Sequence, residues 1–194
     1  MPLAIFTLGY VALAGAYFTL AGNYEFLWYI AVMVLLIGLA GATLKTARLP
    51  LWLLWLLSLW GLLHILGGGV FVGDHVLYAQ VLIPIVGDGE FTVLKYDQVV
   101  HAYGFGVSAL MVRHLVSRAS PDALSGVWLS VLAASAAMGL GAVNEIVEFV
   151  AVVVAPSTGV GGYYNTALDL VFNGLGAILA VTVASLVGKE KEIG

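Results

Sequence analysis

The feature that most constrains this chain is a succession of long apolar segments that carry almost no charge. A membrane-spanning helix needs about 20 mainly apolar residues in a row. Six segments meet this requirement, at about 3–22, 25–44, 50–72, 97–118, 122–154 and 165–187. Charged residues make up only 9% of the chain, against about a quarter in soluble domains. We therefore expect an all-α bundle of six membrane spans, forming a single integral membrane domain over residues 1–194.

Local signals support several of these boundaries. Pro50 and Pro121 fall at or near predicted helix starts, where the missing backbone N–H costs little. The sequence Ser-Pro-Asp at 120–122 supplies an N-cap signal before the fifth span. The first segment lacks the basic start of a secretory signal peptide, so we interpret it as a retained span. Region 73–96 is the one long connection between predicted spans.

The composition excludes several classes of function. The chain has no Cys, which excludes disulfides, thiolate metal sites and a cysteine nucleophile. Its formal net charge of −4 argues against nucleic acid as a partner. The 24 Gly residues gather in the later spans, where small residues allow helix backbones to approach closely.

The positions of Lys and Arg predict the orientation in the membrane. With six spans, only Lys95 falls on one side of the membrane. The basic residues on the other side are Lys45, Arg48, Arg113, Arg118, Lys189 and Lys191. That second side is expected to be cytoplasmic, so both termini are predicted inside and region 73–96 outside.

Polar side chains interrupt the last four spans at one predicted depth. Asp97 and His101 are four residues apart, and so are Asp169 and Asn173, which puts each pair on one helix face. The full set is His64, Asp97, His101, Asn144, Glu145, Glu148, Asp169 and Asn173. Because the fourth span enters from the external side at Asp97, we expect these side chains to converge in the outer leaflet.

Four carboxylates at this depth carry an insertion cost that protons or positive charge must offset. Each acid at a helix centre costs about 2.5–3.5 kcal/mol on insertion scales, and less near the interface. Lys95 is the only basic residue predicted on that side, so either protons or a bound cation must supply positive charge. Carboxylates with imidazoles and no thiolate suit a divalent ion such as Zn, Mn or Fe. The predicted metal ligands are His64, His101, Glu145 and Asp169, with Glu148 or Asp97 as general base and Asn144 and Asn173 as supporting polar groups.

Each of these residues also has a structural interpretation. Asp97 alone reads as a helix N-cap, and His64 alone as an interhelical hydrogen-bond donor. Asp169 with Asn173 could join two helices. Acidic residues and a histidine in the external connection need no functional explanation. The remaining polar and aromatic residues read as loop or interface groups: Asp74, His75, Asp88, Glu90, His114, Tyr163 and Tyr164.

Three sequence stretches resemble known membrane families. "YDQVVHAYGFG", "NEIVEF" and "NTALDLVFNGLGAILA" are similar to the VanZ-like pattern, in which an Asp with a following His opens one helix and Asp-x3-Asn-x2-Gly opens the last. The segment "HILG" at 64–67 makes the chain more similar to the YjdF-like inner-membrane family, DUF2238. The resemblance spans roughly residues 60–180 and implies a multi-pass protein of a prokaryotic plasma or inner membrane. VanZ-like proteins are associated with teicoplanin resistance, but "NEIVE" lacks the Gln and the basic residue of that pattern, so resistance does not carry over.

Three functions remain open at this stage. The first is a metal-dependent hydrolase acting on a membrane lipid or lipid-linked substrate. The second is a proton- or cation-coupled transporter. Two features argue against it: the acids cluster on one side of the membrane, and the sequence shows no evident internal repeat. The third is a structural or accessory protein, alone or as a homo-oligomer, whose polar cluster packs helices. Polar pairs stabilise helix–helix contacts in membranes by only about 1–2 kcal/mol each, which is too little to explain four carboxylates.

Overall fold

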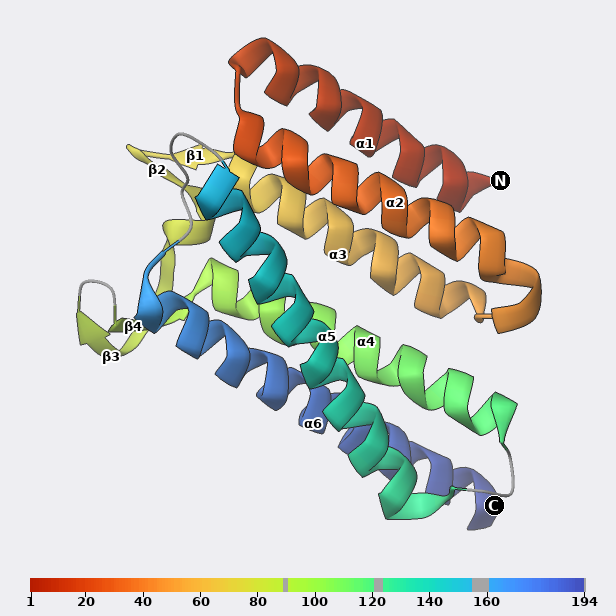
Figure 1. Cartoon of the computed structure of the whole chain (residues 1–194). Coiled ribbons are helices and arrows are strands. Elements are labelled where there is room, and N and C mark those ends of the chain that lie inside the picture. The colour runs from red at the N-terminus through yellow and green to blue at the C-terminus, as the bar shows by residue number, and fades with distance from the viewer. Residues whose placement is uncertain (89–90, 121–123, 155–160, 194) are drawn as a thin grey trace.

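The computed structural model describes residues 1–88, 91–120, 124–154 and 161–193 and contains six long helices (Figure 1). They are α1 (Pro2–Ala21), α2 (Tyr24–Ala47), α3 (Leu51–Gly69), α4 (Tyr96–Ala119), α5 (Gly126–Val154) and α6 (Tyr163–Ile193). All six are long and apolar enough to cross a membrane. The predicted all-α, six-span bundle is confirmed.

The helix ends differ from the predicted spans where the backbone turns. Helix α3 ends at Gly69 and not at 72, because the chain becomes extended at Val70 and enters a strand. Helix α5 begins at Gly126, and the predicted capping residues Pro121 and Asp122 lie outside the described residues. Helix α6 begins two residues before the predicted 165 and continues to Ile193.

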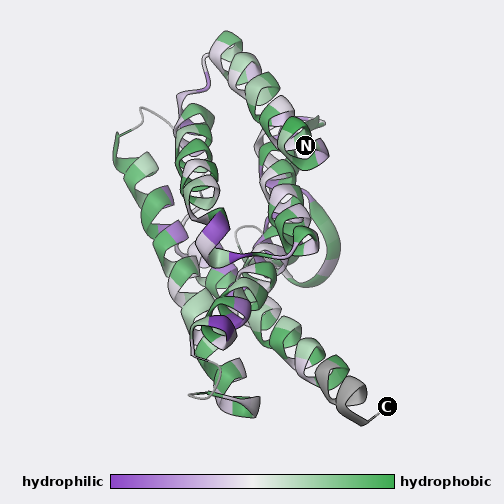
Figure 2. Cartoon of the chain, turned by 90° about the vertical axis from the view of Figure 1, so that its right-hand side faces the viewer, coloured by the Kyte–Doolittle hydropathy of each residue, from purple (hydrophilic) through white to green (hydrophobic). Residues whose placement is uncertain are grey.

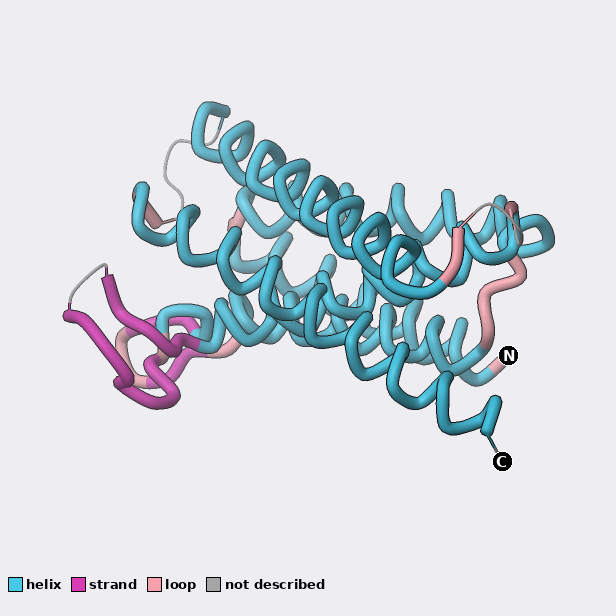
Figure 3. Tube along the Cα trace, turned by 90° about the horizontal axis from the view of Figure 1, so that it is seen from below, coloured by secondary structure: helices cyan, strands magenta, loops and turns pink. Residues whose placement is uncertain are grey.

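The connection between α3 and α4 is folded into two small antiparallel hairpins, which the sequence pattern did not predict. Strand β1 (Phe71–Val72) pairs with β2 (His75–Val76), and a short 3-10 turn, η1 (Leu77–Ala79), follows. Strand β3 (Val81–Asp88) then pairs with β4 (Phe91–Lys95). Figure 3 shows these strands together at one end of the bundle.

Helix α4 lies at the centre of the polar half of the bundle. It packs against α3, α5 and, most extensively, α6. The backbones of α4 and α6 touch, since a Cβ on Gly176 would lie 1.9 Å from the carbonyl oxygen of Ala102. Buried alanines, among them Ala109, Ala137 and Ala177, fill the space between α4, α5 and α6. Small residues therefore bring three helices close enough for short polar side chains to meet between them.

Aromatic side chains join the other helices. Phe18 of α1 stacks on Phe26 of α2 at a centroid distance of 4.9 Å. Gly68 of α3 lies directly beneath Phe26, where any Cβ would overlap the ring. The outer faces of the helices carry exposed Leu, Val and Ile, and Figure 2 shows them hydrophobic over most of their length. This is the surface expected of helices solvated by lipid.

The end of the bundle opposite the hairpins carries basic residues. His114 donates from Nε2 to the carbonyl oxygens of Ala47 and Arg48, at 3.3 and 3.1 Å, and so caps the end of α2. Arg113 donates to Ser130 at 2.7 Å, which ties α4 to α5. Both termini lie at this end (Figures 1 and 3). Which side of a membrane it faces stays a prediction.

Candidate metal centre

His101 is the centre of a buried polar cluster between α4, α5 and α6. His101 is only 6% exposed. Its Nδ1 atom lies 3.0 Å from Oδ1 of Asn173 on α6. An amide oxygen can only accept, so Nδ1 carries a proton, and in the neutral imidazole Nε2 is then the nitrogen with the free lone pair. This is how a second residue fixes a histidine that ligates a metal through its other nitrogen.

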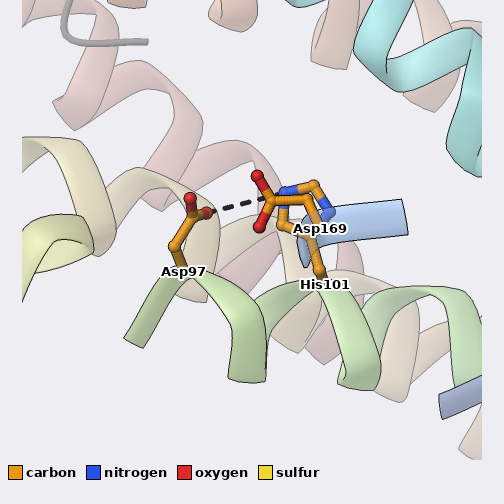
Figure 4. Close-up of side chains that lie close together, drawn as sticks. All are labelled: Asp97, His101 and Asp169. Carbon is orange, nitrogen blue, oxygen red and sulfur yellow. Dashed lines mark ion pairs between the residues drawn. The ribbon is translucent and has the colours of Figure 1, made fainter. Parts of the chain in front are cut away.

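Three carboxylates surround the imidazole at distances beyond a direct hydrogen bond. Nε2 lies 3.5 Å from Asp97 Oδ1 and 4.0 Å from Glu148 Oε1. Nδ1 lies 3.8 Å from Glu145 Oε1. In Figure 4 the side chains of Asp97, His101 and Asp169 lie side by side, with Asp169 reaching in from α6. Two ligand atoms on a tetrahedral ion with bonds of about 2.1 Å are about 3.4 Å apart, so the 3.5 Å separation leaves room for an ion.

Asn165 connects two of the acids and was not singled out in the sequence. Its Nδ2 donates to Oδ2 of Asp169 at 2.6 Å and to Oδ2 of Asp97 at 3.3 Å. It therefore occupies one oxygen of each acid and leaves both Oδ1 atoms toward the cluster. A signal was present, since Asn165, Asp169 and Asn173 follow one another at intervals of four residues on one helix face.

Several buried atoms of the cluster have no hydrogen-bond partner. They are both carboxylate oxygens of Glu145, Oδ1 of Asp169 and Nδ2 of Asn173. Asp169 is fully buried and Asn173 is 1% exposed. Buried polar atoms are normally paired, so these carboxylate oxygens are atoms that a proton, a cation or a water could satisfy. Asn144 meanwhile holds Glu148 by donating to its Oε1 at 2.7 Å.

Among the described residues, two sets of potential ligands have atoms that all lie within 4.8 Å of one another. One set is Asp97, His101 and Asp169, and the other is His101, Glu145 and Glu148. Both sets contain His101, and together they contain every predicted acid of the site. The structure thus brings together residues from α4, α5 and α6.

His64, the remaining predicted ligand, belongs to neither set. Its Nδ1 is hydrogen-bonded to the hydroxyl of Tyr78 in η1, and its ring packs edge-on against Tyr29 at 5.5 Å. Burial raises the pKa of the Tyr78 phenol well above its usual range, so the phenol keeps its proton. The sequence alone suggested that His64 is an interhelical hydrogen-bond donor, whereas the partner of its Nδ1 is the Tyr78 hydroxyl of η1 and not a group on another helix.

Asp97 is not the N-cap of its helix. The cap residue is Lys95, and its backbone N–H donates to Oε1 of Gln98 at 3.1 Å. Gln98 is 1% exposed and also donates to the carbonyl oxygen of Thr92 in β4 at 2.9 Å. Because Gln98 satisfies the start of the helix, the Asp97 carboxylate is left to face His101 and Asn165.

Fold and site together define a class: a multi-pass helical membrane protein with a buried carboxylate–imidazole cluster on its last three helices. The chain belongs to the DUF2238 family of predicted membrane proteins, whose match covers residues 2–190. The match extends over the first two helices, which the motif resemblance had left outside. No comparison supports the VanZ-like resemblance. The comparisons with curated proteins and with solved structures gave no significant match.

Proposed function

We propose that this protein binds a divalent metal ion within the membrane and uses it to hydrolyse a lipid or lipid-linked substrate. The observation that carries the proposal is the arrangement of free ligand atoms around His101. Asn173 occupies Nδ1 of the imidazole, and Asn165 occupies Oδ2 of both Asp97 and Asp169. The atoms left over are Nε2 and two Oδ1 atoms.

The ligand set Asp97, His101 and Asp169 fits such an ion. Imidazole with carboxylates suits Zn, Mn or Fe. Three protein ligands with further positions open are typical of catalytic metal sites, whereas structural sites are closed. A divalent ion there would act as a Lewis acid toward a carbonyl or phosphoryl oxygen. Glu145, which the sequence also predicted as a ligand, belongs to the other set, and its Oε1 lies 3.8 Å from Nδ1, the imidazole nitrogen that Asn173 occupies.

Glu148 is the residue we assign as general base. It lies 4.0 Å from Nε2 of His101, and Asn144 holds its Oε1, so its second oxygen is oriented by one fixed contact. Its side chain is 14% exposed, whereas that of Glu145 is 9% exposed. A base must reach water as well as the substrate, which favours Glu148 over Glu145 and the fully buried Asp169. Asp97, the other predicted base, is 16% exposed, but its Oδ1 lies 3.5 Å from Nε2 of His101, so we assign it as a ligand.

The hydrolase proposal is tested with purified protein in lipid vesicles. Vesicles made from a bacterial total lipid extract are incubated with protein and Zn, Mn or Fe, and the released headgroups and fatty acids are measured by mass spectrometry. We expect product that disappears with a chelator and in Glu148→Gln. Product formation that is equal in Glu148→Gln, or that ignores the chelator, would contradict the assignment.

Cation or proton transport is the second candidate, and Glu145 is the observation that favours it. A buried carboxylate with neither oxygen bonded can take up and release a proton or cation. Transport predicts that vesicles with protein move metal ions or protons across the bilayer, and that Glu145→Gln stops this movement. Hydrolysis predicts no such flux.

A further inference from the structure

We infer that the hairpin formed by β3 and β4 lies in the membrane interface, with its apolar side chains in contact with lipid. Five large apolar residues of β3 are exposed: Val81 by 44%, Leu82 by 47%, Ile83 by 58%, Ile85 by 60% and Val86 by 56%. Successive residues of a strand point to opposite faces, so both faces of this strand present apolar side chains. Within the described part of the chain, the bundle covers neither face of β3.

Water is a poor environment for such a hairpin. An isolated two-stranded hairpin is at best marginally stable in water, and exposed apolar edge strands tend to associate. The hydrocarbon core is also excluded, because unpaired N–H and C=O groups along the open edges would be unsatisfied there. The boundary between headgroups and acyl chains accepts both the side chains and the edges. Pro84, in the middle of β3, has no backbone N–H, so one fewer hydrogen-bond donor of this strand needs a partner.

The hairpin is continuous with the lipid-facing surface of α6. Phe91 of β4 packs edge-on against Tyr164 at 5.6 Å, and Tyr164 packs against Tyr163 at 5.7 Å. Tyr163 is the first residue of α6 and is 80% exposed. Aromatic residues at the end of a membrane-spanning helix mark the membrane–water interface. The contacts between these rings place the hairpin at the same membrane depth as the start of α6. For this reason we propose that lipid, and not a protein partner, covers the apolar side chains of the hairpin.

The base of the hairpin is fixed to the site. Gln98 bonds to the backbone of both Thr92 and Lys95, and the N–H of Tyr96 donates to the carbonyl oxygen of Gln80 at 2.9 Å. Asp97 follows β4 by two residues. A hairpin held at headgroup level would therefore hold Asp97, and with it one edge of the candidate metal centre, close to the same level. The inference itself does not rest on a metal being bound.

The absence of Cys from the chain allows a direct test. Ile85→Cys is labelled with the environment-sensitive dye NBD and reconstituted in vesicles of phosphatidylcholine and phosphatidylglycerol. The matched control is Asp74→Cys, an exposed position in the turn between β1 and β2. We expect iodide to quench the label at 85 about threefold less than the label at 74. A nitroxide near the headgroup should quench it more than one at the chain end.

Two results would overturn the inference. Equal iodide quenching at positions 85 and 74 would place the hairpin in water. Energy transfer between labelled copies that rises with the protein-to-lipid ratio, without nitroxide quenching, would show a second copy on this surface. Leu82→Cys, at a second exposed position of β3, repeats the measurement, and the helical circular dichroism of each labelled protein confirms that it is folded.

Discussion

At the scale of single residues, two asparagines determine what the acids of the cluster can do. Asn173 accepts from Nδ1 of His101 and so sets the position of the imidazole proton. Asn165 holds one oxygen each of Asp97 and Asp169. Neither amide carries charge, but each selects which atoms remain free to bind a cation. In the proposed metal centre they would act through its ligands.

Removing the Asn173 amide should weaken metal binding without unfolding the protein. Asn173→Ala frees the imidazole to rotate and to change tautomer, so we expect metal affinity to fall about 10- to 100-fold. Competition with a coloured chelator in detergent measures the affinity. The matched control on the same helix is Thr182→Ala, whose exposed hydroxyl bonds only to the carbonyl oxygen of Ile178 in its own helix. Equal affinities in the two variants would contradict the role of Asn173.

Residue spacing allowed part of this cluster to be predicted. The four-residue intervals of Asp97 with His101, and of Asp169 with Asn173, follow from helix geometry alone. The contact between His64 and Tyr78 could not be foreseen, because it depends on how a non-helical connection folds back onto α3. Asn165 was overlooked because it stands at the predicted start of the last span, where a polar residue has a simpler explanation.

At the scale of elements, the site depends on the backbone contact between α4 and α6. His101 and Asn173 meet across these helices one turn from the place where Gly176 touches Ala102. The abundance of Gly in the later spans predicted close helix packing in general. It did not show which helices meet. The hairpins between α3 and α4 were missed because a span-by-span analysis of hydrophobicity treats any shorter apolar run as a loop.

Substituting Gly176 should therefore disturb both stability and binding. In Gly176→Ala the new Cβ would lie 1.9 Å from a backbone oxygen, so the helices must separate. We expect a destabilisation of about 1–3 kcal/mol, together with weaker metal binding. Thermal unfolding in detergent measures the first effect and chelator competition the second.

Gly139 of α5 offers the matched control, because a Cβ there meets no atom within 4 Å. Gly139→Ala should leave both quantities unchanged or raise stability slightly. If Gly176→Ala proved as stable as Gly139→Ala, the tight α4–α6 contact would be wrong.

At the scale of the whole molecule, the fold follows from hydrophobicity, but orientation does not follow from the fold. The hairpins lie at one end of the six-helix bundle and the termini at the other. Asp97 and His101 of the cluster lie in the first turns of α4, which follows directly from β4. Which end faces the cytoplasm is decided during insertion by Lys and Arg. The prediction that the hairpin end is external therefore rests on sequence alone.

Single cysteines test this orientation. Thr46→Cys lies near the end of α2, and Asp74→Cys lies at the hairpin end. In intact cells a membrane-impermeant maleimide should label position 74 and spare position 46 until the cells are opened. The reverse pattern would place the cluster in the inner leaflet and would require a substrate from that side.

The most direct test of the central claim is the metal content of the purified protein. Elemental analysis should find about one Zn, Mn or Fe ion per chain in the parent protein and a loss of that ion in the double variant His101→Ala/Asp169→Asn. Thr182→Ala serves as the folded control and should retain the ion. A correctly folded parent that takes up no divalent ion, even after incubation with each of the three, would contradict the metal centre and leave protonated acids that carry protons or join helices.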